Sequence, residues 1–166
     1  MIKTGRVWKF GDDISTDLIS PGRYIHLRTN LPELAKHTFE DINPEFSKKV
    51  KAGDFVVAGK NFGLGSSREH AACVLKILGI SAVIAKSFAR IFYRNAINIG
   101  LVVLECDSDK IDDGDILELN LEEGILFNKT KSEYLSFSPL PKVMLNILKD
   151  GGLIEHIKKH RNIIIS

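Results

Sequence analysis

The chain has 166 residues, of which 44% are hydrophobic and 27% are charged, and this composition is ordinary for one globular domain with its own core. A formal net charge of +2 without a long basic run argues against nucleic-acid binding, and apolar runs of about four residues are far shorter than the roughly 18 that a membrane helix needs. Because the amino terminus lacks the apolar region of a signal peptide, and the two cysteines form neither a disulfide framework nor a C-x-x-C motif, we expect one cytoplasmic domain over residues 1–166, bound to neither membrane nor nucleic acid.

The amino-terminal part of the chain predicts one strand followed by loops and short helices. The strand is expected at residues 5–10, before an acidic, turn-rich loop over residues 11–17. The aspartates of that loop do not have the spacing of a calcium-binding loop, so we predict no metal there. Residues 23–30 mix cations with apolar groups without a clear period, which predicts a mobile loop. Short helices are expected from Pro32, which suits the first helical position, and within residues 44–50.

The middle of the chain alternates apolar runs with helical patterns. Short continuous apolar runs are typical of buried parallel strands, and they occur at residues 55–58, 82–85 and 101–104, the last within a strand expected at residues 101–106. One helix is expected from near Ser67 to Gly79, and a second follows Ser87, a fair N-cap. This alternation of strands and helices predicts an α/β fold with a mostly parallel central sheet flanked by helices.

The C-terminal part predicts a small antiparallel meander, because its apolar residues alternate with polar ones. Its strands are expected at residues 116–121, 125–127 and 134–138. Two helices are expected after it, at residues 143–148 and 153–160. His156 and His160 lie one turn apart near the end of the last helix, where imidazolium groups would favour the helix dipole.

The segment from Asn61 to His70 joins a predicted strand to a predicted helix through a turn that contains glycine. The first N–H groups of a helix have no partner within it and the aligned peptide dipoles make that end partly positive, so a carboxylate or phosphate is stabilised there. Ser66 and Glu69 also fit a capping box, which would give the segment a purely structural role. A cap does not explain Arg68, because a cation in the first turn opposes the dipole; Arg68 suits a ligand for a bound anion.

Other kinds of site fail on residue type. The glycine turn lacks the Gly-Lys-Ser/Thr ending of a Walker A loop, and Arg68 stands where a dinucleotide fingerprint needs its third glycine. Neither serine is followed by the glycine of a hydrolase elbow. His70 and Cys73 share one face of the predicted helix, but two ligands do not complete a zinc site, so packing is the favoured role.

Three segments resemble sequence motifs of the aconitase superfamily: Asp12–Asp17, Asn61–Ala71 and Lys86–Asn95. Their order and spacing, and the length of the chain, are similar to those of the separate small subunits of the 3-isopropylmalate dehydratase family. The resemblance covers essentially the whole chain. It implies the swivelling β/β/α domain of that superfamily.

The resemblance also implies an activity that this chain cannot perform alone. The family dehydrates a hydroxy acid and rehydrates it at the neighbouring carbon, here 2-isopropylmalate and 3-isopropylmalate in leucine biosynthesis, with a [4Fe-4S] cluster as the Lewis acid. Two isolated cysteines cannot supply the three thiolates of such a cluster, so we expect no metal or cofactor on this chain. The cluster is expected in a large subunit, in a heterodimer or heterotetramer, and a homo-oligomer is an alternative state of the isolated chain.

The family's site residues can be carried over one by one. Ser66 matches the catalytic base, an alkoxide that removes the proton next to a substrate carboxylate. Unpaired helix N–H groups and Arg68 are suitable donors to hold that anion. Ser67 and Arg68 match contacts to the substrate carboxylate. Asp17 matches a catalytic-site aspartate that supports the arginine and the neighbouring loop.

The resemblance places the substrate-specificity loop at Tyr24, Ile25, His26, Leu27, Arg28 and Thr29. Arg28 falls where aconitase-like relatives have a substrate arginine, which suits a further carboxylate and leaves homoaconitase, acting on homocitrate, or a related hydro-lyase as the alternative. Ile25 and Leu27 would instead meet an isopropyl branch, with Arg28 turned to solvent. A stand-alone carboxylate-binding domain is the alternative outside the enzymes.

Overall fold

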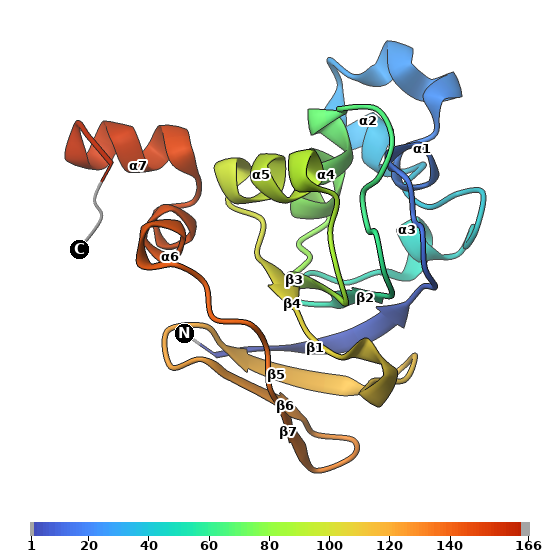
Figure 1. The fold of residues 1–166 in the computed structure, drawn as a ribbon. Coiled ribbons are helices and arrows are strands. Elements are labelled where there is room, and N and C mark those ends of the chain that lie inside the picture. Colours follow the sequence, from blue (N-terminus) through green and yellow to red (C-terminus); the bar gives the residue numbers. More distant parts are fainter. Residues whose placement is uncertain (1, 164–166) are drawn as a thin grey trace.

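A single mixed sheet forms the centre of the computed structural model, which describes residues 2–163. Its seven strands follow the order β4-β3-β2-β1-β5-β6-β7 (Figure 1). The parallel part consists of β1 (Ile2–Lys9), β2 (Phe55–Ala58), β3 (Ala82–Ala85) and β4 (Val103–Glu105). The antiparallel part consists of β5 (Ile116–Asn120), β6 (Ile125–Asn128) and β7 (Glu133–Leu135). The predicted parallel sheet and meander are therefore confirmed, and they are joined in one sheet.

Strand β1 joins the two parts because its halves pair with different neighbours. Val7 to Lys9 pair in parallel with β2, while Ile2 to Arg6 pair antiparallel with β5. The strand begins earlier than the sequence predicts, since the pairing with β5 extends it to Ile2. Strands β2 and β3 are fully buried, as their continuous apolar runs predict.

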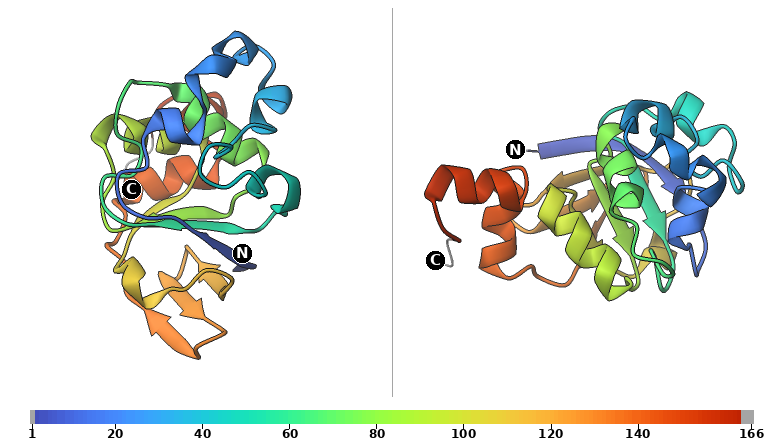
Figure 2. Two further views of the ribbon diagram at one scale, coloured as in Figure 1. Left: turned by 90° about the vertical axis from the view of Figure 1, so that its right-hand side faces the viewer. Right: turned by 90° about the horizontal axis from the view of Figure 1, so that it is seen from above.

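The helices lie above the parallel strands in Figure 1, whereas β5 to β7 lie below them. The chain crosses from β1 to β4 in one direction, so right-handed crossovers place their helices on the same face. The helices are α1 (Thr16–Ile19), α2 (Leu31–Ala35), α3 (Phe46–Lys49), α4 (Glu69–Ile77), α5 (Arg90–Ile99), α6 (Lys142–Lys149) and α7 (Leu153–His160), with short 3-10 helices η1 (Gly22–Leu27) and η2 (Ser108–Lys110). Seen from above, α6 and α7 lie at one end of the molecule and α1 to α3 at the other (Figure 2). No helix within residues 2–163 has the length and apolar character needed to cross a membrane.

Three local predictions were wrong. A tertiary contact explains the late start of α5, and another, described with the site below, explains the late start of α4. Most of the segment predicted as a mobile loop, residues 23–30, forms η1. Helix α4 begins at Glu69 instead of near Ser67. Helix α5 begins after Ala89 instead of Ser87, because the Ser87 side chain accepts a hydrogen bond from the Asn61 backbone N–H at 2.8 Å. Ser66 and Ser87, which were expected to cap helices, thus lie in loops that are hydrogen-bonded to neighbouring loops.

The turn after β2 requires glycine at position 63. Gly63 has a φ of +84°, and an added Cβ would lie 2.3 Å from Cγ of the buried Phe92 ring. We expect Gly63→Ala to lower the free energy of unfolding by about 3 kcal/mol or more, from backbone strain and overpacking together. Chemical denaturation measures the loss. In Gly124→Ala the φ is also positive, +67°, but nothing lies within 4 Å, so that control should lose only about 1–2 kcal/mol. Equal losses in the two variants would contradict the steric explanation.

Candidate active site

The three motif segments meet at one edge of the sheet, beyond the carboxyl ends of β1, β2 and β3. The loop after β1 pairs with the loop after β2: the Gly63 N–H donates to the Ile14 carbonyl at 2.7 Å, and the Thr16 N–H donates to the Leu64 carbonyl at 2.8 Å. The loop after β2 also pairs with the loop after β3, through Phe62 and residues 87–89. Parallel strands bring their carboxyl ends to the same edge, which is the usual place of a ligand site in such sheets.

Two residues in the left-handed backbone region fix the first pair of loops. Asp13 has a φ of 57° and Asn61 a φ of 59°, and the Asn61 amide donates to the Asp13 carboxylate at 3.1 Å. Short polar side chains tolerate this backbone conformation better than other non-glycine residues. Two residues with this backbone conformation therefore lie where two motif segments contact each other, as is common next to functional sites.

Ser66 and Ser67 are exposed in the loop before α4. Arg68 is the N-cap residue of α4 and the helix has no side-chain cap, so the capping-box interpretation of Ser66 and Glu69 is wrong. The Thr16 hydroxyl instead donates to the Ser66 backbone carbonyl at 2.9 Å. Thr16 thereby fixes the backbone of Ser66 without using the Ser66 hydroxyl. Thr16 lies within the first motif segment, but nothing in the sequence pattern indicates this role for it.

Ser66 and Ser67 line a small pocket of about 70 Å³. One wall is polar and contains Thr16, Ser66, Ser67 and Arg68. The opposite wall comes from the start of α5 and its preceding residue, where Ala89, Ile91, Phe92 and Asn95 line it. The hydroxyl-bearing loop is thus at an opening of the surface and is not enclosed by the protein. Asn95 is a further polar group that the sequence analysis did not single out.

Arg68 is held by the loop after β1. Its Nη1 lies 3.2 Å from the Asp17 carboxylate and donates to the Ser20 carbonyl at 3.3 Å. The same Asp17 oxygen accepts the Gly22 N–H at 2.8 Å, which ties the start of η1 to the pair. Asp17 and Arg68 are therefore together, as the sequence analysis expected. Because the Asp17 side chain is 61% exposed, the pair positions Arg68 more than it stabilises the fold.

The predicted specificity loop corresponds to η1 and the residues after it. Ile25, His26, Arg28 and Thr29 are exposed, while Tyr24 and Leu27 are half-buried. Arg28 contacts its own loop through a hydrogen bond of 3.3 Å from Nη1 to the Ile25 carbonyl. It does not line the pocket that contains Ser66.

His70 connects Arg28 electrostatically with the site. Burial lowers the pKa of His70, and the charges of Arg68 and Arg28 lower it further. Both guanidinium groups therefore act on one imidazole in the first turn of α4, and the neutral ring is favoured. Packing is the role that the sequence favours for His70 and Cys73, and within the described part of the chain the two residues belong to no group of three potential metal ligands.

A charge cluster anchors the specificity loop. Arg23 donates to Asp41 at 2.7 and 3.0 Å and to Glu40 at 2.7 Å, and Tyr24 stacks on His37 with ring centroids 3.7 Å apart. The hydrogen bond from Arg23 lowers the pKa of Asp41. The pKa of Glu40 is lowered chiefly by its hydrogen bond to Tyr24, and also by His37 and Arg23.

These lowered pKa values predict an acid-labile anchor. A carboxylate with a lowered folded-state pKa contributes stability that is present above its ordinary pKa and is lost as the pH falls through the folded value. We therefore expect wild type to exceed Arg23→Gln in stability near pH 6, and the difference to vanish as both carboxylates are protonated. Denaturation of both proteins between pH 6 and pH 2 measures it. The effect should be small, since the side chains are 33% to 50% exposed. A difference that grows on acidification would contradict the anchor.

Neither cysteine is arranged as a cluster ligand. Cys73 is half-buried and Cys106 is buried. Burial raises the pKa of both thiols, whereas a metal ligand must be a thiolate. Two thiols also fall short of the three that a [4Fe-4S] cluster with one open iron requires. The residues of this chain therefore do not fit such a cluster.

Comparison with known proteins identifies the family of this chain. The aconitase C-terminal domain family matches residues 14–109, a range that contains the second and third motif segments whole and the first from Ile14 onward. A 3-isopropylmalate dehydratase small subunit from Archaeoglobus fulgidus is 64% identical over 165 residues, covering 99% of this chain and 100% of the relative. The chain belongs to the 3-isopropylmalate dehydratase small-subunit family.

Further members of that family are similar over nearly their whole length. A small subunit from Thermotoga maritima is 62% identical over 157 residues, covering 94% of this chain and 95% of the relative. The crystal structure of 3-isopropylmalate dehydratase (LeuD) from Methanocaldococcus jannaschii matches with a TM-score of 0.93 at 48% identity, covering 97% of this chain and 96% of that one. The resemblance to the aconitase superfamily and the expected fold are thereby confirmed.

Proposed function

We propose that this chain is the small subunit of a two-subunit hydro-lyase, 3-isopropylmalate dehydratase, which interconverts 2-isopropylmalate and 3-isopropylmalate in leucine biosynthesis. The observation that carries the proposal is the small pocket in which Ser66, Ser67 and Arg68 lie together, with Asp17 hydrogen-bonded to the arginine. Relatives that carry this enzyme's name support it over nearly the full chain length. The whole chain, residues 1–166, acts in this proposal as one domain in the cytoplasm.

Ser66 is the proposed base. Its alkoxide would remove the proton from the carbon next to a substrate carboxylate and return one in the reverse direction. A serine hydroxyl is a very weak acid in water, so the site must stabilise the anion. The N–H groups at the start of α4 and the guanidinium of Arg68 are the donors available for that purpose.

Ser67 and Arg68 are proposed to bind the substrate carboxylate. Asp17 holds Arg68 through Nη1, so the remaining N–H groups of the planar guanidinium are available for a carboxylate. His70, neutral behind the two arginines, adds no third positive charge. The cations at this edge thus suit an acidic substrate.

A large subunit is the proposed partner, in a heterodimer or heterotetramer. It would carry the [4Fe-4S] cluster, which supplies the Lewis acid for the substrate hydroxyl. The exposed loop with Ser66 and Ser67 is the part of the small subunit that such a partner would cover. Without the partner we expect no turnover.

Arg28 favours a second candidate substrate, a tricarboxylate such as homocitrate. Its charge and that of Arg68 both lower the pKa of His70, so both positive charges are felt at the first turn of α4. An isopropyl branch cannot form a hydrogen bond or ion pair with an arginine, whereas an additional carboxylate would form both. The exposed Ile25 beside it favours the apolar branch.

Reconstitution with a cluster-bearing large subunit tests these alternatives. We expect turnover of isopropylmalate to exceed that of homocitrate, and Arg28→Ala to change isopropylmalate kinetics by less than about threefold, because an exposed arginine outside the pocket contributes little binding energy. Arg6→Ala, on the part of β1 paired with β5, is the charge control. If homocitrate is preferred and only Arg28→Ala abolishes that preference, the enzyme is a homoaconitase. A complex that forms without turning over any hydroxy acid would indicate a carboxylate-binding domain instead.

A further inference from the structure

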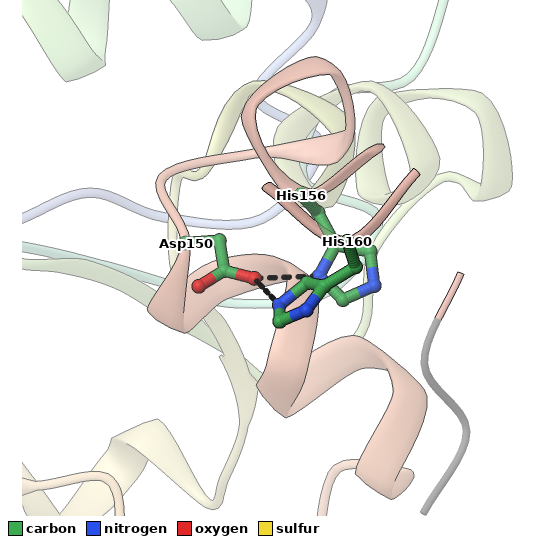
Figure 3. Close-up of side chains that lie close together, drawn as sticks. All are labelled: Asp150, His156 and His160. Atoms are coloured by element: carbon green, nitrogen blue, oxygen red, sulfur yellow. Dashed lines mark hydrogen bonds and ion pairs between the residues drawn. The ribbon is translucent and has the colours of Figure 1, made fainter. Parts of the chain in front are cut away.

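Two helices at the C-terminal end converge on a cluster of metal-binding side chains. Asp150 is the C-cap residue of α6, and His156 and His160 lie one turn apart on α7 (Figure 3). The Asp150 Oδ2 atom lies 2.7 Å from His156 Nδ1 and 2.9 Å from His160 Nε2. One ligand atom from each of the three residues lies within 4.8 Å of the other two. Within the described residues no other group of this kind occurs.

The backbone around the cluster is fixed by its packing against α5. Gly152, with a φ of +130°, approaches α5 so closely that an added Cβ would lie 2.7 Å from the Asn98 carbonyl oxygen. Lys76 of α4 donates to the carbonyls of Ile99 and Gly151, the latter at 2.9 Å. The His156 N–H donates to the Gly152 carbonyl at 2.9 Å. Contacts with α4 and α5, together with the hydrogen bond to Gly152, thus fix the turn that sets the distance between Asp150 and the two histidines.

Burial and ligand type suit a divalent metal ion. The His156 side chain is fully buried and the Asp150 side chain is 6% exposed, while His160 is 32% exposed. Hydrogen bonds from His156, Lys159 and His160 lower the pKa of Asp150 to about 2, so the carboxylate is charged at neutral pH. Two imidazoles and one carboxylate form a common ligand set for zinc and other divalent transition metals.

We propose that Asp150, His156 and His160 bind one divalent transition-metal ion, with Zn²⁺ as the best match. Ligand atoms at about 2.0–2.2 Å from a tetrahedral ion lie about 3.3 Å from one another. The present separations of 2.7 and 2.9 Å to Asp150 are about half an ångström shorter than that, and all three ligand atoms lie within 4.8 Å of one another. The ion would replace the protons that the two rings now share with the carboxylate. It would fasten α7 to the end of α6, beside α5.

Lys159 opposes the ion and makes the proposal testable. Its Nζ lies 3.2 Å from the Asp150 Oδ1 atom, so it neutralises part of the charge that a metal would use. If the cluster is only a hydrogen-bonded helix contact, removing Lys159 weakens it. If the cluster binds a metal, removing Lys159 strengthens metal binding.

The direct test is a titration of the untagged full-length chain, freed of metal by a chelator, with Co²⁺ as the probe and Zn²⁺ as the competitor. We expect one Co²⁺ per chain, with visible absorption bands of a four- or five-coordinate ion that Zn²⁺ removes. His160→Ala should lower the affinity by about 100-fold or more, because loss of even an outer partner of a ligand costs 10- to 100-fold. His160 is chosen because its removal leaves the buried Asp150–His156 contact in place. His26→Ala, which removes an exposed histidine of η1, should bind as wild type does.

The lysine pair completes the test. Lys159→Ala should bind Co²⁺ about tenfold more tightly, since it removes a unit charge a few ångströms from the ion. Lys158→Ala, whose lysine pairs with Glu155, is the matched control and should change the affinity less. Zn²⁺ should also raise the Tm of wild type more than that of His160→Ala. Absence of the bands, equal binding by wild type and His160→Ala, or weaker binding by Lys159→Ala would each overturn the proposal.

Discussion

Replacing Ser66 with alanine is expected to reduce turnover by the reconstituted enzyme by about 10³-fold or more, because the proposed base is lost. The Thr16 hydrogen bond goes to the Ser66 backbone carbonyl, so the alanine variant keeps it and the loop should keep its conformation. Binding to the large subunit should therefore be unchanged. The measurements are kcat at saturating large subunit, and complex formation by isothermal titration calorimetry.

Ser67→Ala is the matched control for Ser66. It removes a hydroxyl from the adjacent exposed position of the same loop. We expect it to raise KM with a much smaller loss of kcat, because Ser67 is proposed to bind the substrate carboxylate. A Ser66→Ala enzyme that retains more than a tenth of the wild-type kcat would show that another group is the base. Failure of that variant to assemble would assign Ser66 to the interface instead.

Arg68→Lys is expected to raise KM by about tenfold to 100-fold, the cost of losing one or two charge-assisted hydrogen bonds. Lysine keeps the charge but not the planar fork that can contact Asp17 and a substrate carboxylate at once. Steady-state kinetics on the reconstituted complex measure the change. The stability of the isolated chain should hardly move, because the Asp17 side of the pair is mostly exposed.

Asp17→Asn separates the positioning of Arg68 from its charge. The amide oxygen can still accept the Gly22 N–H, so the start of η1 should remain in place. The arginine loses its ionic partner, and we expect a rise in KM that is smaller than that of Arg68→Lys. Unchanged kinetics in Arg68→Lys would show that Arg68 does not bind the substrate. A larger effect of Asp17→Asn than of Arg68→Lys would point to a direct role for the carboxylate.

The sheet was predictable because buried parallel strands leave a plain signal. The runs at residues 55–58 and 82–85 are apolar at every position, and the structure has strands with those bounds. The meander was equally visible from its alternation. The register of β1 could not be predicted, since nothing within residues 2–6 indicates that residues 116–120 are their partners. Pairing over such a separation is set by the packed fold and not by local preference.

The proximity of the candidate site residues was predictable, and their local geometry was less so. Ser66, Ser67, Arg68 and Asp17 lie together as expected, but local rules placed the start of α4 too early. A serine followed three residues later by glutamate satisfies the capping-box pattern in any sequence. Here the Thr16 hydroxyl, some 50 residues earlier in the chain, donates a hydrogen bond to the Ser66 carbonyl. This bond holds the Ser66 backbone in the loop before the helix. The partner of His156 and His160 was hidden for a similar reason, because Asp150 belongs to the preceding helix.

The divided pairing of β1 has a consequence for synthesis on the ribosome. Its second half can join β2 as soon as residues 55–58 emerge, but its first half remains an unpaired edge until residues 116–120 follow. Exposed edges of this kind recruit other strands, and contacts that are distant in sequence form slowly. The nascent chain therefore passes through a stage in which its amino-terminal residues are open to pairing with another polypeptide. Stalling of translation between those two points should promote aggregation more than stalling after residue 120.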